Sequence, residues 1–108
     1  MKTGDIILVP FPFADFTQRK VRPCVVICET KDKFRDIVVA AVSSVVPAEL
    51  NENDILLTPD KVNNLRTTSV LKVDRIVTIK QDDIIAKLGQ LDNVLLKLFL
   101  EKFKNLAQ

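Results

Sequence analysis

The stretch Asp5-Ile6-Ile7-Leu8-Val9-Pro10, near the start of this 108-residue chain, decides its fold class. Four consecutive apolar residues stand between an acidic residue and a proline, which is the pattern of a short buried β-strand. Pro10 and Pro12 lack the backbone N–H that a central strand needs, so the chain must leave the sheet and enter a polar loop over residues 14–20. We therefore expect a small β-protein that opens with a buried strand.

Further strand patterns follow this loop, separated by turn signals. Residues 36–46 are apolar on both faces, which predicts a strand in the middle of the sheet. Residues 67–79 predict a long strand whose apolar side chains share one parity and hence one face; these side chains are Leu71, Val73, Val77 and Ile79. The expected strands are residues 21–27, 36–46, 54–57, 67–79 and, as either a strand or a short helix, 84–88.

One amphipathic helix is expected after Asp92, whose short acidic side chain suits a helix N-cap. Apolar residues recur there at spacings of three and four, as in a helix that packs on a core. The apolar stripe comprises Leu91, Leu95, Leu98, Phe99, Phe103 and Leu106, widened by Leu96 and Leu100. A stripe this broad fits a well-buried helix and fits equally a surface for an oligomer or another protein.

Five or six short strands before one helix predict a mainly β fold with a C-terminal helix, in the form of a small SH3-like barrel. The chain is 47% hydrophobic and 28% charged, a globular balance, and shows no repeat or linker, so a single domain over residues 1–108 is expected. Asp5 and Pro10 leave no room for a signal-peptide core, and no apolar run approaches the ~20 residues that span a bilayer. We expect a soluble, cytoplasmic protein with no membrane partner.

The composition excludes several kinds of site. The chain has no His, which rules out Ser-His-Asp triads and nucleases with paired histidines. It has no Trp or Tyr, which disfavours a module that binds proline-rich peptides. Cys24 and Cys28 would lie about 13 Å apart on one strand, too far for a disulfide, so we expect buried, inert thiols and no metal site. The net charge of +2 permits a nucleic-acid partner without arguing for one.

Several segments, in order and spacing, resemble the MazF/PemK/Kid toxins. They are Gly4-Asp5-Ile6-Ile7-Leu8-Val9-Pro10-Phe11, then Arg22-Pro23-Cys24-Val25-Val26-Ile27, the Ala40-Ala41-Val42-Ser43-Ser44 segment, the run over residues 68–79, and Leu88-Gly89-Gln90-Leu91 before the amphipathic helix. Together they cover nearly the whole chain.

The resemblance implies the toxin of a type II toxin–antitoxin system, with an SH3-like barrel that forms a homodimer. Such toxins are metal-independent endoribonucleases of the mRNA interferase type, which cleave single-stranded RNA at short preferred sequences. The RNA's 2′-OH attacks the adjacent phosphorus and leaves a 2′,3′-cyclic phosphate and a 5′-OH. The resemblance thus implies no cofactor, and as partners it implies mRNA and a cognate antitoxin.

The resemblance makes Arg22 and Ser43 the candidate catalytic residues. The guanidinium of Arg22 offers donors in a fork that suits phosphate oxygens, and Pro23 keeps the backbone of Arg22 extended. Ser43 stands where the family carries a catalytic threonine, and it keeps the hydroxyl but lacks the methyl group that fixes the rotamer. By strand alternation Ser44 points to the opposite face, which makes it the natural control.

Two further groups of residues are second candidates. Asp74 and Arg75 are expected in the RNA site or the dimer contact, or as a solvated pair at a strand rim. Loop residues could guide the RNA backbone or read a base, or be merely solvated; they are Thr17, Gln18, Arg19 and Lys20. Phe13 and Phe16 could stack on a base or fold back. For the general base, Arg22, Asp74, Glu29 and water stay open.

The main rival interpretation is a catalytically inactive MazF-like fold that binds the antitoxin or acts as a regulatory DNA- or RNA-binding partner. It follows from the serine at position 43 and the low net charge.

Overall fold

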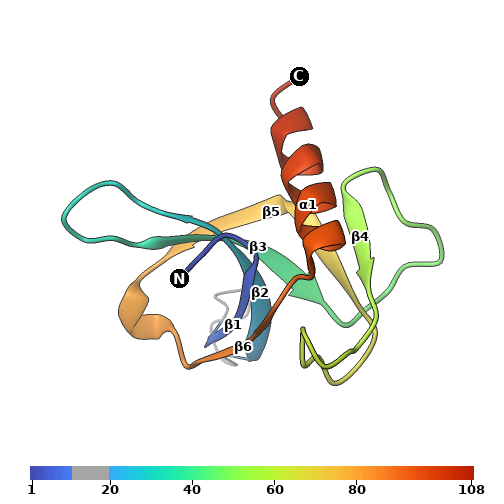
Figure 1. Ribbon diagram of the computed structural model, residues 1–108, viewed down its shortest axis with the longest axis horizontal. Coiled ribbons are helices and arrows are strands. Elements are labelled where there is room, and N and C mark those ends of the chain that lie inside the picture. Colours follow the sequence, from blue (N-terminus) through green and yellow to red (C-terminus); the bar gives the residue numbers. More distant parts are fainter. Residues whose placement is uncertain (11–19) are drawn as a thin grey trace.

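The computed structural model describes residues 1–10 and 20–108. Six strands, one 3-10 turn and one α-helix follow one another along the chain (Figure 1). They are β1 (Asp5–Pro10), β2 (Val21–Glu29), β3 (Ile37–Ser43), β4 (Asp54–Leu57), β5 (Ser69–Ile79), η1 (Gln81–Asp83), β6 (Ala86–Gln90) and α1 (Asn93–Asn105). The predicted mainly β fold with a C-terminal helix is confirmed, and the alternative left open for residues 84–88 resolves as a short turn followed by a strand.

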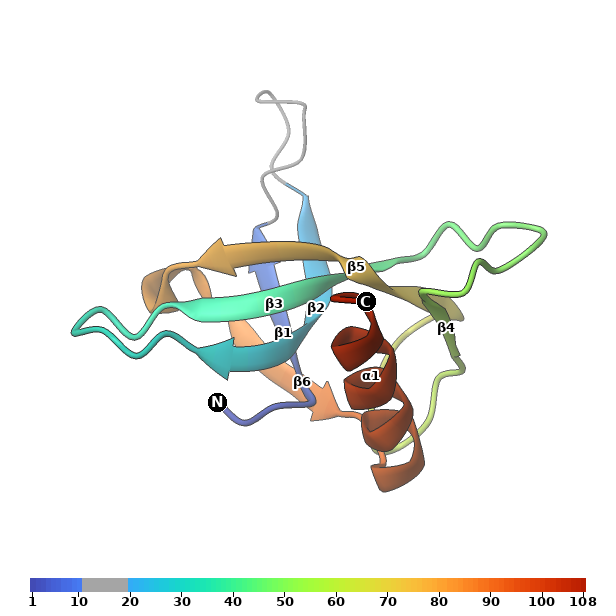
Figure 2. The ribbon, with the colours of Figure 1, turned by 90° about the horizontal axis from the view of Figure 1, so that it is seen from above.

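The strands form one antiparallel sheet in the order β4-β5-β3-β2-β1-β6. The sheet curls around α1 as a half-barrel (Figure 2). The expected central position of β3 is confirmed, because β5 and β2 flank it. β3 ends at Ser43, three residues earlier than predicted, where the Val45 N–H donates to Ser43 Oγ at 3.1 Å and turns the chain out of the sheet.

A bulge in β5 overturns the predicted single apolar face of that strand. Ala41 pairs with Lys72, but Ala40 pairs with Ile76, so β5 has three extra residues at this point. Because this number is odd, odd-numbered residues of β5 face one side of the sheet before the bulge and the opposite side after it. Consequently Leu71 and Val73 lie in one apolar cluster, whereas Val77 and Ile79 belong to the other.

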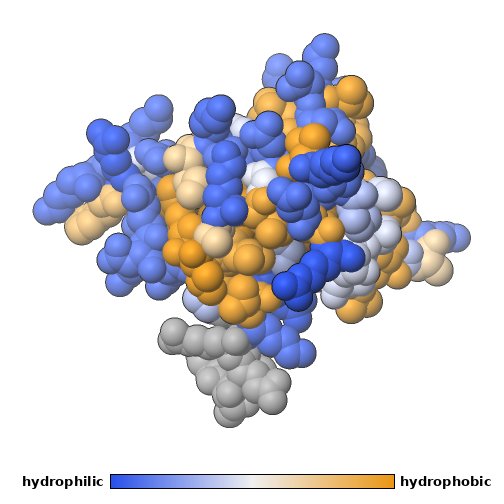
Figure 3. Space-filling view, turned by 60° about the horizontal axis from the view of Figure 1, so that its bottom comes forward, coloured by the Kyte–Doolittle hydropathy of each residue, from blue (hydrophilic) through white to orange (hydrophobic). Residues whose placement is uncertain are grey.

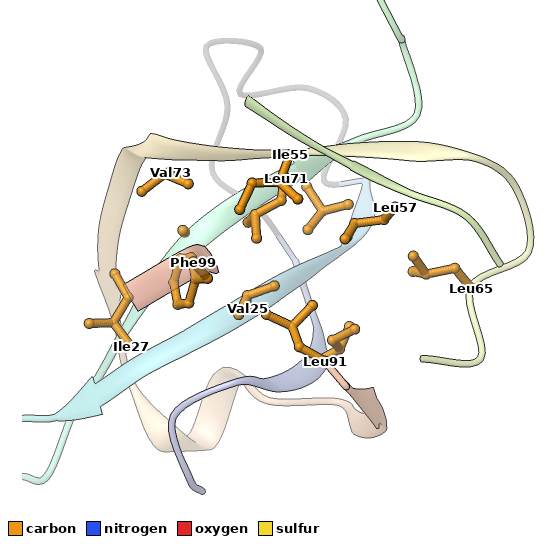
Figure 4. Packing of buried hydrophobic residues seen from close by; sticks show 12 residues of the cluster. Val25, Ile27, Ile55, Leu57, Leu65, Leu71, Val73, Leu91 and Phe99 are labelled. Carbon is orange, nitrogen blue, oxygen red and sulfur yellow. The ribbon is translucent and has the colours of Figure 1, made fainter. Parts of the chain in front are cut away.

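The first apolar cluster fills the space between the curled sheet and α1. Phe99, fully buried on α1, points into the concave side of the sheet near Ile27 and Val73 (Figure 4). The helix begins as predicted, because Asp92 Oδ1 accepts the Leu95 N–H at 2.8 Å. Leu91 of the stripe is buried as well, the other members are only partly covered, and Leu98 and Leu100 stay exposed.

The segment between β4 and β5 is fixed by the side chain of Asn63, which is buried. Asn63 Oδ1 accepts the N–H groups of Asp60 and Leu65, and its Nδ2 donates to the Thr58 carbonyl. The Val62 carbonyl accepts the Gln90 N–H at 3.1 Å and so ties the segment to β6. This segment carries Leu65 and Arg66 to the end of the half-barrel where β2 begins.

The two cysteines differ in their surroundings. Cys24 is buried in the second apolar cluster, as expected, but Cys28 is exposed. The prediction of a buried thiol is wrong for Cys28, because the pairing of β2 with β3 shifts by one residue between Val26 and Cys28 and breaks the alternation. Among the described residues, no helix is long and apolar enough to cross a membrane.

Candidate functional site at the ends of β2 and β3

Arg22 lies at the start of β2 and is half-buried. It pairs with Val9 of β1 and shares the parity of Cys24, so its side chain belongs to the sheet face of the second apolar cluster. Pro23 holds Arg22 extended because the proline ring disfavours helical geometry at the preceding residue. The strand therefore fixes the direction in which the guanidinium leaves the sheet.

Ser43 lies on that same face. Cys24 pairs with Ala41 across β2 and β3, and continuing this register by two residues brings Arg22 opposite Ser43. The last paired residues of the two strands are Cys24 and Ala41, so Arg22 and Ser43 lie just beyond the paired region and on the same face. Ser43 Oγ already accepts the Val45 N–H, which leaves the hydroxyl hydrogen to donate.

The same face continues onto β5 and β4 with a charged pair that the sequence analysis did not identify. Lys72 pairs with Ala41 on one side and with Asp54 on the other. Since Ser43 pairs with Val70, Lys72 stands diagonally beside Ser43, at about 7–8 Å between backbones. Lys72 Nζ lies 3.7 Å from Asp54 Oδ1, and the Asp54 carboxylate is buried.

Asp54 is anchored at one oxygen only. Its Oδ2 accepts the Asn51 N–H at 3.1 Å, whereas Oδ1 is buried and accepts no hydrogen bond from the described residues. The ammonium of Lys72, itself one quarter exposed, is the counter-charge of this oxygen. Arg22, Ser43 and Lys72 thus stand in neighbouring positions on one face of three adjacent strands.

A cleft of about 530 Å³ opens on the other side of these strand ends. Ser44 and Ser69 line it, which agrees with the alternation that sends Ser43 to the opposite face. Its described lining combines an apolar wall with hydroxyl-bearing residues and three cationic residues, and includes no carboxylate; it consists of Leu8, Lys20, Val21, Arg22, Pro23, Ser44, Leu65, Arg66, Thr67, Ser69 and Leu88. Arg22 is the residue shared by the cleft and the face that carries Ser43.

Asp74 and Arg75 lie elsewhere. Both are exposed and belong to the three extra residues of the β5 bulge. Asp74 Oδ2 accepts a hydrogen bond of 3.5 Å from Asn53 Nδ2, on the β4 side of the strand. Neither residue lines the cleft, and β3 separates their strand from Arg22.

A family model for the PemK-like, MazF-like toxin of type II toxin–antitoxin systems matches residues 2–106. The chain belongs to this family. The solved structure of the Mycobacterium tuberculosis toxin MazF-mt6 is similar, with a TM-score of 0.68 and 19% sequence identity over 94% of this chain and 93% of that one. At this identity the similarity shows the fold, a curled MazF-like sheet with one terminal helix. No curated protein matches the chain significantly.

The loop residues singled out in the sequence of this MazF-like chain fall in two places. Thr17, Gln18 and Arg19 lie outside the described residues, as do Phe13 and Phe16. Lys20, also singled out, is exposed and lines the cleft.

Glu29, one of the candidate bases, is far from the other site residues. It lies at the opposite end of β2, about 23 Å from Arg22 at ~3.3 Å per residue. There its carboxylate meets the N-terminal ammonium at 3.6 Å. Glu29 therefore does not share a site with Arg22. In residues 1–10 and 20–108 no three His, Cys, Asp or Glu side chains are grouped so that they could hold a metal ion.

Proposed function

We propose that this chain is a ribosome-independent, metal-independent endoribonuclease that cleaves single-stranded RNA, acting as the toxin of its toxin–antitoxin pair. Family membership supports the role of toxin. The observation that carries the catalytic proposal is the placement of Arg22, Ser43 and Lys72 on one face of β2, β3 and β5. Two cations flanking a hydroxyl donor suit a phosphate whose negative charge grows during the reaction.

In the proposed reaction, the 2′-OH of the RNA attacks the adjacent phosphorus, and the bond from phosphorus to the 5′-oxygen breaks. The products are a 2′,3′-cyclic phosphate and a free 5′-OH. Arg22 contacts the non-bridging oxygens in bidentate fashion, which stabilises their added charge. Ser43 donates its hydroxyl hydrogen to one of these oxygens, and Lys72 adds a second positive charge on the same side.

The cleft beyond Arg22 supports a place for the nucleotide next to the cleaved bond. Its apolar wall suits the face of a base, and Lys20 and Arg66 suit the flanking phosphate. The hydroxyls of Ser44 and Thr67 can bond to base edges. A volume of about 530 Å³ is typical of sites that take a small-molecule-sized group.

We further propose that the protein acts in the cytoplasm as a homodimer and that a cognate antitoxin neutralises it. The exposed apolar residues of α1 support a protein contact there, because apolar side chains that gather on a surface mark protein–protein contacts. These residues are Val94, Leu98 and Leu100.

The proposal is tested by incubating purified protein with long single-stranded RNA in EDTA. Wild type should cut and leave cyclic phosphate ends, whereas Arg22→Ala should lose several orders of magnitude in rate. Ser43→Ala should lose rate as well, while the control Thr78→Ala, which removes an exposed hydroxyl of β5 outside the cleft, should keep the wild-type rate. Failure of wild type to cut any of several RNAs of varied sequence would favour the inactive, partner-binding interpretation.

A further inference from the structure

The turn between β2 and β3, residues 30–36, forms an arm that projects from the half-barrel (Figures 1 and 2). Its surface is largely hydrophilic (left side of Figure 3). A broad, open cleft of about 830 Å³ separates the arm from the N-terminal segment. Cationic side chains dominate its lining and are Lys2, Lys31, Lys33 and Arg35, together with the N-terminal ammonium of Met1.

The two carboxylates in this lining are engaged within the protein. Glu29 meets the N-terminal ammonium at 3.6 Å. Asp32 Oδ1 accepts the Thr30 hydroxyl at 2.8 Å and the N–H groups of Phe34 and Arg35 at 3.1 and 3.2 Å. In contrast, no carboxylate among residues 1–10 and 20–108 forms an ion pair with the cationic side chains of the arm. The arm therefore offers positive charge to a partner.

An exposed aromatic side chain stands among these charges. Phe34 is 66% exposed, and Lys33 Nζ lies 5.2 Å from the centre of its ring. A second cleft, of about 430 Å³, adjoins the ring, and its lining mixes both signs of charge: Asp36, Lys80, Gln81 and Asp82 line it beside Phe34. An aromatic ring flanked by lysines is the combination with which proteins hold single-stranded nucleic acid without sequence preference.

The arm is held in one conformation. The Thr30 N–H donates to the Asp36 carbonyl at 2.8 Å, and Gln81 Nε2 donates to the Arg35 carbonyl at 2.6 Å. Arg35 adopts a φ of 49°, a left-handed conformation that the turn requires. A ligand that contacts Phe34 would therefore have to order few additional groups.

We propose that the arm is a second RNA-binding site, at which a base of the substrate stacks on Phe34 while Lys31, Lys33 and Arg35 contact neighbouring phosphates. This inference rests on the proposed function. β2 joins the two sites and separates Arg22 from Glu29 by about 23 Å. Stacked nucleotides advance about 3.4 Å each, so roughly seven of them span this distance. The arm thus binds substrate well outside the cleaved bond and favours long RNA over short RNA.

The experiment compares two RNA oligonucleotides that carry the cut site found with long RNA. Both have a 2′-deoxy sugar before the cut, which blocks cleavage; one has about five nucleotides and the other about twenty. Dissociation constants are measured by fluorescence anisotropy across a range of salt concentrations. Wild type should bind the long RNA more tightly, and Phe34→Ala should weaken binding of the long RNA about tenfold while leaving the short RNA unchanged.

The lysines give an independent readout that a structural role would not affect. Lys31→Gln with Lys33→Gln should lower the salt slope for the long RNA by about 0.7 per lost phosphate contact. Val45→Ala removes an exposed apolar residue of the other projecting loop, and Lys97→Gln removes a charge from α1; both should leave binding of either RNA unchanged.

The outcomes separate the two proposals. If wild type cuts RNA but Phe34→Ala binds the long RNA as wild type does, the arm proposal fails and the nuclease proposal stands. If wild type neither cuts nor binds RNA, both fail. If Phe34→Ala weakens only the binding of a co-expressed antitoxin, the arm is a protein contact and the RNA assignment is overturned.

Discussion

Lys72 of β5 and Asp54 of β4 form an ion pair across adjacent strands, with Nζ 3.7 Å from a carboxylate oxygen that has no hydrogen bond from the described residues. The pair lies on the sheet face that carries Arg22 and Ser43. The buried carboxylate of Asp54 attracts the ammonium of the partly exposed Lys72 and so keeps this ammonium on that sheet face. We infer that Asp54 positions Lys72 for contact with the RNA phosphate.

Lys72→Gln should lower kcat/KM for RNA cleavage about tenfold or more, because a charge-assisted contact contributes about 1.5–3 kcal/mol. Lys72→Arg should recover part of this loss, since it keeps the charge. Asp54→Asn should show a smaller loss, because Asn can still accept the Asn51 N–H. A cleavage assay at fixed salt measures these effects, with Lys97→Gln as the control on α1. Equal rates for Lys72→Gln and wild type would remove Lys72 from the proposed site.

The two thiols should differ in reactivity. Burial raises the pKa of the Cys24 thiol to about 12, so at pH 8 it is neutral as well as covered. Cys28 is exposed. Native protein should therefore take up one equivalent of iodoacetamide, at Cys28, and two after denaturation, as counted by mass spectrometry.

Cys28→Ser is the control for thiol labelling, and in the native state this variant should take up none. Modification of both thiols at similar rates in the native protein would mean that β2 opens far more readily than its buried position implies.

The sequence was sufficient for the strands and the helix because each follows a local pattern, such as the apolar run of β1 or the N-cap at Asp92. The β5 bulge could not be predicted in this way, because parity within one strand assumes regular pairing with its neighbour. The positions of Val77 and Ile79 were misjudged for that reason.

The candidate site shows the same division between local and long-range information. Arg22 and Ser43 were found through family resemblance, whereas Lys72 was missed. Its relation to Ser43 depends on the register between β3 and β5, which no pattern within either strand records. The engagement of Glu29 with the N-terminus likewise became apparent only when the ends of β2 were placed.

Gly89 should be required for stability, because β6 passes close to the segment between β4 and β5. A Cβ at this position would overlap the backbone carbonyl oxygens of Val62 and Asn63, lying 2.6 Å from the latter. Backbone atoms cannot move aside as a flexible side chain can, so Gly89→Ala should lower the free energy of unfolding by about 1–3 kcal/mol.

Urea denaturation measures the effect of Gly89→Ala, with Ala86→Ser, an exposed change in the same strand, expected within about 0.5 kcal/mol of wild type. Gly89→Ala should also cut RNA more slowly if displacement of the segment between β4 and β5 moves Arg66 out of the cleft. A stability equal to that of wild type would show that β6 can separate from this segment at little cost.

Acid should loosen the β2–β3 arm through Asp32. The hydrogen bond from the Thr30 hydroxyl, with those from the Arg35 and Phe34 N–H groups, lowers the pKa of the Asp32 carboxyl from its ordinary value of 3.8. A lowered pKa in the folded state means that the arm is stabilised above pH 3.8 and loses this contribution as the pH falls through the lower folded value.

Amide chemical shifts of Phe34 and Arg35, followed by NMR from pH 6 to pH 2, should therefore titrate below pH 3.8. In Asp32→Asn the same amide signals should not titrate, because the side-chain amide oxygen still accepts these hydrogen bonds but does not bind a proton in this pH range. A wild-type midpoint at or above pH 3.8 would contradict the hydrogen bonding that holds Phe34 in place.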